Sequence, residues 1–192
     1  ECWVSRSGYT GEDGYEISVP VAAATDLAKA LLAHADVELI GLGARDSLRL
    51  EAGLCLYGQD MDADLNPVEA SLSWAIQKVR RSTGARAGGF PGADAILNAL
   101  DTGVARHRVG LQPEGRAPMR HGVPLFAEAD GGAQFGVVTS GGFGPSVEKP
   151  VAMGIVADSL HTPGTTLYGE VRGKRMPVTV VKLPFVTPGF KR

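Results

Sequence analysis

Apolar residues recur at helical spacing in three stretches of the first half of the chain. Between residues 21 and 32 they fall three or four positions apart, and Asp26 and Lys29 lie outside that apolar face. Residues 44–52 are rich in helix formers. Residues 91–100 begin with a proline, which suits the first turn of a helix. We therefore predict three helices, the first of them amphipathic and packed against a sheet.

Short apolar or alternating runs lie before and between these helices. Residues 3–6 and 16–20 form two of them, and a third runs from Val37 to Ile40. The resulting order of strand, helix, strand and helix favours α+β packing. Trp74 follows in a segment that we expect to be buried, because a large aromatic ring packs in a core more often than it binds a ligand.

After Gly103 the pattern changes to short β-favouring segments separated by glycine, proline and acidic turns. These segments are residues 106–111, 124–128, 134–140, 151–156, 166–173 and 176–183. Helical spacing is absent there, so the sheet must bury one face by forming a Greek-key sandwich or a partly closed barrel. The sequence therefore predicts an α+β region over residues 1–100 and a small all-β Greek-key or barrel domain over residues 101–192.

Charge narrows the range of functions. The formal net charge is −2 and the isoelectric point is near 6.1, with no basic stripe along the chain. This argues against nucleic acid or an anionic membrane as the main partner. No apolar run is long enough to cross a bilayer.

Cysteine and histidine spacing gives no indication of a metal site. Cys2 and Cys55 stand alone, without a CxxC motif, and are expected to be reduced structural thiols. The four histidines are His34, His107, His121 and His161. Because no two of them have an HxxxH spacing, we predict neither a metal ligand nor a catalytic histidine among them.

A glycine-punctuated acidic loop occupies residues 8–14. Glu12, Asp13 and Glu16 place three carboxylates within five positions, next to two tyrosines. The glycine spacing alone could suggest phosphate binding, but clustered acids repel a phosphate and no lysine follows. An acidic β-turn between two strands is one interpretation of this loop, and a loop that holds a heterocycle is the other.

Residues 41–62 combine two arginines with an acidic loop. Arg45 and Arg49 stand four positions apart on one face of the predicted helix 44–52, and Asp46 is expected to orient Arg45. The simplest alternative is that both arginines form surface ion pairs with Asp46 and Glu51. The aspartates at positions 60, 62 and 64 follow Gly58 in a loop that is expected to be polar and exposed.

Several segments have sequence motifs that are specific to one family. They are SRSGYTGEDGYEISVP at 5–20, ARDSLRLEAGLCLYGQDMD at 44–62, NPVEASLSWAIQKVRR at 66–81, FPGAD at 90–94, APMRHG at 117–122, VVTSGGFGPS at 137–146, VAMGIV at 151–156 and PFV at 184–186. In order and spacing they resemble the glycine cleavage system aminomethyltransferases, the T-proteins. Members of that family carry a long portion before the segment that matches residues 5–20, so we expect this chain to be a C-terminal fragment.

The resemblance implies a reaction and its partners. A T-protein transfers the methylene carbon from the aminomethyl-lipoyl arm of the H-protein to tetrahydrofolate, giving 5,10-methylenetetrahydrofolate and ammonia, with the P- and L-proteins as pathway partners. It implies tetrahydrofolate as co-substrate and no metal, in the cytoplasm of a bacterium or the mitochondrial matrix of a eukaryote. The family's important aspartate belongs to the preceding portion, so the isolated fragment is expected to be inactive.

The resemblance also implies three folate-contacting residues. Matching the motifs residue by residue assigns Glu16 and Arg45 to this role, and Phe190 follows from alignment through PFV, where the family often has tyrosine. A carboxylate accepts paired N–H groups from a pterin edge, and a guanidinium suits a ring oxygen or the glutamate tail. Two other functions stay open: a folate-binding module of a related dehydrogenase or non-catalytic folate-dependent protein, and a purely structural interaction domain.

Overall fold

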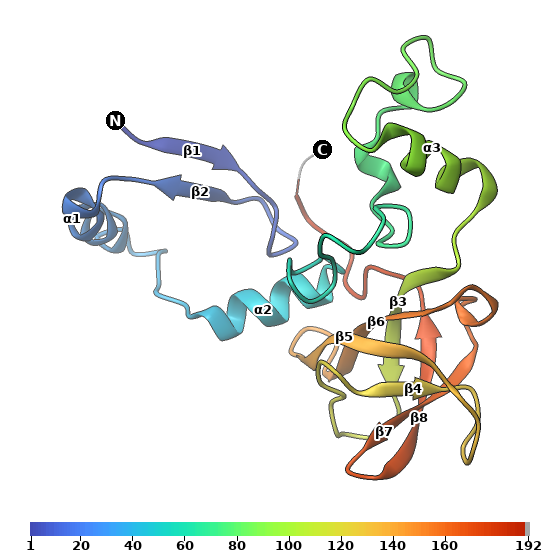
Figure 1. Cartoon of the computed structure of the whole chain (residues 1–192). Coiled ribbons are helices and arrows are strands. Elements are labelled where there is room, and N and C mark those ends of the chain that lie inside the picture. The colour runs from blue at the N-terminus through green and yellow to red at the C-terminus, as the bar shows by residue number, and fades with distance from the viewer. Residues whose placement is uncertain (191–192) are drawn as a thin grey trace.

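The computed structural model describes residues 1–190 and contains an N-terminal arm, a central helix and a barrel (Figure 1). The helices are α1 (Val21–Leu32), α2 (Leu42–Glu51) and α3 (Ala93–Thr102), with short 3-10 helices η1 (Ser73–Ala75), η2 (Lys78–Arg80) and η3 (Asp158–Leu160). The strands are β1 (Trp3–Arg6), β2 (Tyr15–Ser18), β3 (Arg106–Pro113), β4 (Pro124–Phe126), β5 (Gln134–Gly144), β6 (Lys149–Ala157), β7 (Thr166–Val171) and β8 (Lys174–Val181).

The six predicted β-segments of the second part all form strands, and these strands close into one antiparallel barrel in the order β3-β6-β5-β4-β7-β8. Closure leaves no unpaired sheet edge, and it lets the alternating apolar residues share one interior. Gly141 of β5 allows the 117–122 segment to approach closely, because a side chain at this position would collide with the carbonyl group of Met119. The predicted all-β barrel is confirmed.

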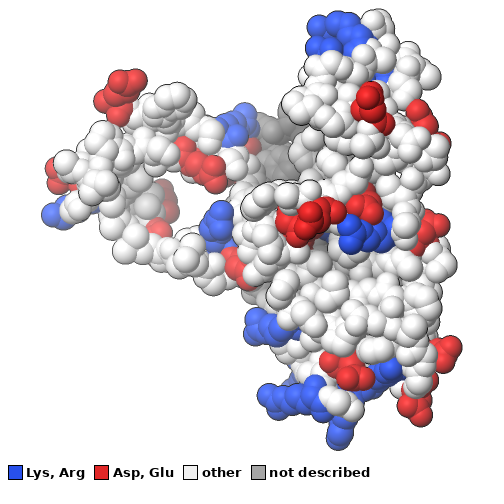
Figure 2. Space-filling view, viewed as in Figure 1, with Lys and Arg blue, Asp and Glu red and all other residues white. Residues whose placement is uncertain are grey.

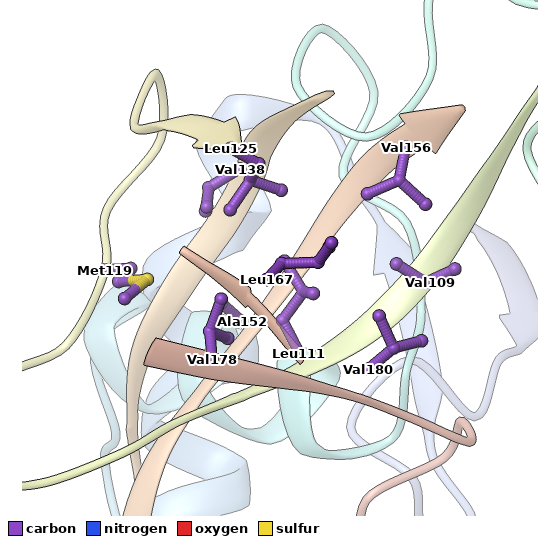
Figure 3. Packing of buried hydrophobic residues seen from close by; sticks show 10 residues of the cluster. All are labelled: Val109, Leu111, Met119, Leu125, Val138, Ala152, Val156, Leu167, Val178 and Val180. Carbon is purple, nitrogen blue, oxygen red and sulfur yellow. The ribbon is translucent and has the colours of Figure 1, made fainter. Parts of the chain in front are cut away.

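The barrel interior forms the main hydrophobic core of the part of the chain that is described. Its buried residues, shown in Figure 3, are Val109, Leu111, Met119, Leu125, Val138, Ala152, Val156, Leu167, Val178 and Val180. They come from all six strands and from the 117–122 segment. A second, smaller group of Leu50, Val151 and Met153 lies where α2 meets the barrel. The barrel is therefore the rigid body on which the other elements are placed.

The N-terminal arm, residues 3–32, consists of the β1–β2 hairpin and α1 and projects away from the barrel in Figure 1. The two strands and the helix form as predicted, and Ser5 pairs with Glu16 across the hairpin. The expected packing of α1 against a sheet is wrong for the described residues, since no residue of this helix is buried. The strand predicted at 37–40 is also absent, because this extended segment has no neighbouring strand with which to pair.

Helix α2 is fixed to the barrel through its last turn. Arg49 is 1% exposed, and its Nη1 donates to Oδ2 of Asp60 at 2.7 Å while its Nη2 donates to Ser140 Oγ of β5 at 3.0 Å. Asp46 accepts from Arg49 at 2.6 Å and 2.8 Å. Two predictions are therefore wrong: Asp60 is fully buried rather than in a solvated loop, and Asp46 orients Arg49 instead of Arg45.

Glu51 provides a second attachment to the barrel. Its carboxylate accepts hydrogen bonds from the backbone N–H and hydroxyl of Ser146 at 2.7 Å and 2.8 Å, and from the N–H of Val147 at 3.1 Å. Glu51 thus binds the turn between β5 and β6. The alternative in which the arginines pair with Asp46 and Glu51 therefore holds for Asp46, which pairs with the buried Arg49, but not for Glu51 within residues 1–190. Gly53 ends the helix with a left-handed backbone at φ +67°, as glycine favours there.

Charged side chains of either sign are scattered in small groups over the face seen in Figure 2. Among residues 1–190, none of the helices combines the length and apolar character needed to cross a bilayer.

Removing the centre of the barrel core should destabilise the protein strongly. Leu111→Ala deletes a fully buried side chain and is expected to lower the free energy of unfolding by about 2–5 kcal/mol, through lost burial and a residual cavity. Urea denaturation measures this loss. The control is Phe135→Ala on β5, which is 45% exposed and should cost about 1 kcal/mol or less. Equal losses for the two variants would contradict this account of the core.

Breaking the buried Arg49–Asp60 pair should also be costly. Arg49→Met leaves the Asp60 carboxylate buried without its counter-charge and is expected to lower the free energy of unfolding by about 3–5 kcal/mol. Asp60→Asn should cost less, because Arg49 keeps its hydrogen bonds to the Asp46 carboxylate. The double variant should lose less than the sum of the two, because the residues are in direct contact. Urea denaturation of all three, with exposed Arg86→Met as control, tests this; additive losses would mean that the pair is not coupled.

Candidate functional site

Glu16 and Arg45 lie on the walls of one cleft of about 440 Å³. Glu16 is the second residue of β2, and Arg45 is in the first turn of α2, so the arm supplies the carboxylate and the central helix supplies the guanidinium. The full lining is Ser7, Tyr9, Thr10, Gly14, Tyr15, Glu16, Ile40, Gly41, Leu42 and Arg45. Both charged side chains are exposed, so they are accessible to a ligand that enters the cleft.

Tyr9 provides a flat face beside Arg45. The guanidinium carbon of Arg45 lies 4.6 Å from the centroid of the Tyr9 ring, within the range of a cation–π interaction. The Tyr9 hydroxyl donates to the carbonyl oxygen of Cys55 at 2.9 Å. Burial raises the pKa of Tyr9, and the positive charges of Arg49 and Arg45 oppose that rise. The phenol is therefore neutral near pH 7, and it holds its ring against α2 without adding charge to the cleft.

The glycine-punctuated loop of residues 8–14 is a tight turn between β1 and β2, as the β-turn interpretation predicted. The N–H of Ser7 donates to the carbonyl of Gly14 at 2.9 Å, which closes the hairpin. Gly11 is buried with φ +85°, and a Cβ there would lie 3.1 Å from the Cβ of Ala52. The loop therefore rests on the end of α2, and this contact places Tyr9 between the arm and the helix.

Phe190 lies next to the cleft, in a neighbouring depression of about 380 Å³. Ser7 and Tyr9 line both the cleft and this depression. The ring of Phe190 covers Gly8 so closely that a Cβ at Gly8 would be 2.7 Å from Phe190 Cδ1. The preceding residue, Gly189, donates its N–H to Gly11 at 2.8 Å. The structure thus gathers all three sequence-predicted residues around one loop, although Phe190 belongs to the far end of the chain.

The predicted burial of Trp74 is wrong, because its side chain is 75% exposed rather than part of a core. It lies in the 3-10 turn η1, none of whose three residues is buried. The indole lines the depression that contains Phe190 and also a larger cavity of about 850 Å³. Sequence reasoning missed this cavity, whose walls come from the turn that follows α2, from η1 and β3, from the segment after η3 and from the C-terminal segment.

The cleft is built to hold a flat polar molecule rather than to attack it. A carboxylate and a guanidinium can each make paired hydrogen bonds with a planar heterocycle, and the tyrosines offer stacking surfaces. Cys55, the cysteine nearest to Tyr9, is no activated nucleophile, because burial raises the pKa of its thiol and so disfavours the thiolate. The arrangement therefore suits binding and orientation.

Substitutions at Tyr9 should distinguish the contribution of its hydroxyl to stability from that of its ring. Tyr9→Phe removes the hydrogen bond to Cys55 and is expected to lower the free energy of unfolding by about 1 kcal/mol. Tyr9→Leu also removes the aromatic face beneath Arg45, worth about 0.5–1 kcal/mol more. Urea denaturation distinguishes these losses, with Tyr57→Phe at a 70% exposed position as the control. If Tyr9→Phe were as stable as the unmodified chain, the hydrogen bond would contribute nothing.

Comparison with known proteins identifies relatives over nearly the whole chain. Residues 1–80 match the GCVT N-terminal domain, and residues 106–187 match the glycine cleavage T-protein C-terminal barrel domain. The chain is 53% identical over 189 residues to the mitochondrial aminomethyltransferase of Homo sapiens and 52% identical over 188 residues to that of Flaveria anomala. These alignments cover 98% and 97% of this chain, but 45% and 44% of the relatives.

A solved structure agrees with these matches. The crystal structure of the glycine cleavage system aminomethyltransferase T from Bartonella henselae superposes with a TM-score of 0.89 and 49% identity, over 100% of this chain and 51% of that one. The chain thus spans about half the length of the relatives it matches. From its two domain matches, its identity to named aminomethyltransferases and its shared fold, the chain belongs to the glycine cleavage T-protein family.

Proposed function

We propose that this chain carries folate-binding residues of an aminomethyltransferase that transfers a methylene carbon to tetrahydrofolate. The observation that supports this most directly is the shared cleft, where Glu16 and Arg45 face the same space and Phe190 lies in the adjoining depression. The relatives at 49–53% identity are named aminomethyltransferases, which favours this activity over that of a dehydrogenase-linked folate module.

Each residue has a distinct role in this proposal. The Glu16 carboxylate accepts the adjacent N–H groups of the pterin edge, and the Arg45 guanidinium binds a ring oxygen or the glutamate tail of the folate. Phe190 closes one side of the site with an apolar ring. Together they hold the folate nitrogen in a fixed orientation towards the carbon that it attacks. This positioning lowers the entropic part of the reaction barrier.

The other reactants in this proposal are those of the T-protein family to which the chain belongs. The carbon donor in this proposal is an aminomethyl group on the lipoyl arm of the H-protein, and the products are 5,10-methylenetetrahydrofolate, ammonia and the H-protein with its lipoyl arm in the dithiol form. The P- and L-proteins complete the pathway. The reaction would take place in the mitochondrial matrix of a eukaryote, as in the relatives named mitochondrial, or in the cytoplasm of a bacterium.

The described residues supply binding groups, but not a base for the folate nitrogen. Asp46 is next to Arg45 in the sequence, and Asp60 lies in the loop that follows α2. Both carboxylates are paired with Arg49. Neither is therefore free to orient or deprotonate a ligand in the cleft. We expect the isolated chain to bind a reduced folate weakly and to be inactive in the transfer reaction.

Folate binding can be measured by thermal melting of this chain, and of an N-terminally extended form, with and without tetrahydrofolate under anaerobic conditions. A specific site stabilises the native state by mass action. Glu16→Gln and Arg45→Lys should each weaken binding about tenfold or more, which corresponds to about 1.4 kcal/mol. Phe190→Ala should weaken it less, since it contributes one ring face.

The control variants make the same two kinds of substitution at positions outside the cleft. Glu38→Gln and Arg86→Lys change exposed side chains that do not line it and should leave the affinity unchanged. Stabilisation of the extended form alone would show that the pocket needs residues beyond this chain. A complete lack of stabilisation in both forms would overturn the proposal in favour of a structural interaction domain.

A further inference from the structure

The structure brings two distant histidines together on one aspartate. His107 of β3 and His161, which follows η3, are 54 positions apart in the sequence, yet their rings stack with centroids 4.1 Å apart. One nitrogen of each faces the same carboxylate oxygen: His107 Nε2 lies 2.8 Å and His161 Nδ1 lies 3.5 Å from Asp158 Oδ1. One donor atom from each of the three residues lies within 4.8 Å of the others.

The backbone holds this cluster on the barrel. His107 pairs with Val156 in the β3–β6 ladder, two residues before Asp158. The N–H of Asp158 donates to the carbonyl of Ala105 at 2.9 Å, which attaches the start of η3 to the residue before β3. His107 therefore projects from a barrel strand, and Asp158 and His161 project from the η3 turn that is hydrogen-bonded to the start of that strand. Such support from rigid elements is what a ligand site requires to keep its donors in place.

We propose that His107, Asp158 and His161 bind a divalent transition-metal cation of the Zn²⁺ type. Imidazole nitrogen and carboxylate oxygen are both normal zinc ligands at about 2.0–2.2 Å, so neighbouring donors of a tetrahedral ion are about 3.3 Å apart. The observed separations of 2.8 Å and 3.5 Å lie on either side of this value. A cation at this position takes the place of the proton between His107 Nε2 and the Asp158 carboxylate, and of the one that His161 Nδ1 shares with the backbone carbonyl oxygen of Asp158, 2.5 Å away.

The surroundings leave room for a fourth ligand. His107 and His161 both line the cavity of about 850 Å³ that also contains Trp74 and Phe190. The side chains of the cluster are 24%, 61% and 42% exposed for His107, Asp158 and His161, so a cation can reach them from solvent. Three protein ligands with an open position is the arrangement of zinc sites that also bind water or a small ligand. The site is separate from the Glu16–Arg45 cleft, which shares none of these residues.

Direct metal binding tests this inference. The chain carries Cys2→Ser, because an exposed thiol at residue 2 would bind zinc on its own, and is treated with a chelator and desalted. Zn²⁺ titration by calorimetry should then show one saturable site, and Co²⁺ should give the intense visible absorption of a tetrahedral complex. Mg²⁺, which prefers an octahedral shell of oxygen ligands, should not compete. Zn²⁺ should also raise the melting temperature.

The variants connect binding to the three residues. His107→Ala, Asp158→Asn and His161→Ala should each weaken Zn²⁺ binding at least about tenfold. His121→Ala removes an exposed histidine that lies outside the cluster and should leave binding unchanged. Melting curves without metal establish that each variant is folded. The inference is overturned if no saturable site appears, or if binding persists in the His107→Ala/His161→Ala double variant, in which case the cluster is only a hydrogen-bonded corner of the barrel.

Discussion

The buried ion pair between Arg49 and Asp60 is the contact on which the arrangement of this protein depends. Both side chains are almost completely removed from solvent, and a buried charge is tolerated only when a partner and hydrogen bonds compensate for its lost hydration. Arg49 has five such contacts, including Ser140 of the barrel, and Asp60 accepts from Thr139 and Ser140 on the same strand. These bonds have direction as well as strength, so they set the position of α2 on the barrel more strictly than apolar contacts would.

The folate-binding arrangement that we propose follows from this fixed helix. Arg45 lies one turn before Arg49, so the attachment of the last turn determines where the guanidinium points into the cleft. At the other end, the carbonyl oxygen of Glu51 accepts from Phe185 and Val186, which brings the C-terminal segment back towards the 8–14 loop. Residues from both ends of the chain therefore meet at α2, and the barrel acts as the support that holds them.

The two walls of the cleft differ in rigidity. Arg45 stands on a helix whose last turn is buried, whereas Glu16 stands on a hairpin in which both strands are exposed along their whole length. Few buried contacts mean a low cost of local opening. The distance between the carboxylate and the guanidinium is therefore set mainly by the contact of Gly11 with Ala52 and by the Tyr9 ring, which join the arm to the helix.

Apart from the strand expected at 37–40, the sequence by itself determined the local elements and the family, because strand propensity, turn residues and sequence motifs are encoded by near neighbours. The six barrel strands follow from that pattern, and the proposed folate-binding role of Glu16 and Arg45 rests on the motifs that contain them. Only the tertiary structure decided which charges are buried and which distant residues meet. Asp60 is buried and Trp74 is exposed, contrary to the prediction, because burial depends on what packs against a residue. His107 and His161 meet on one aspartate because the barrel closes, and spacing along the chain does not report that closure.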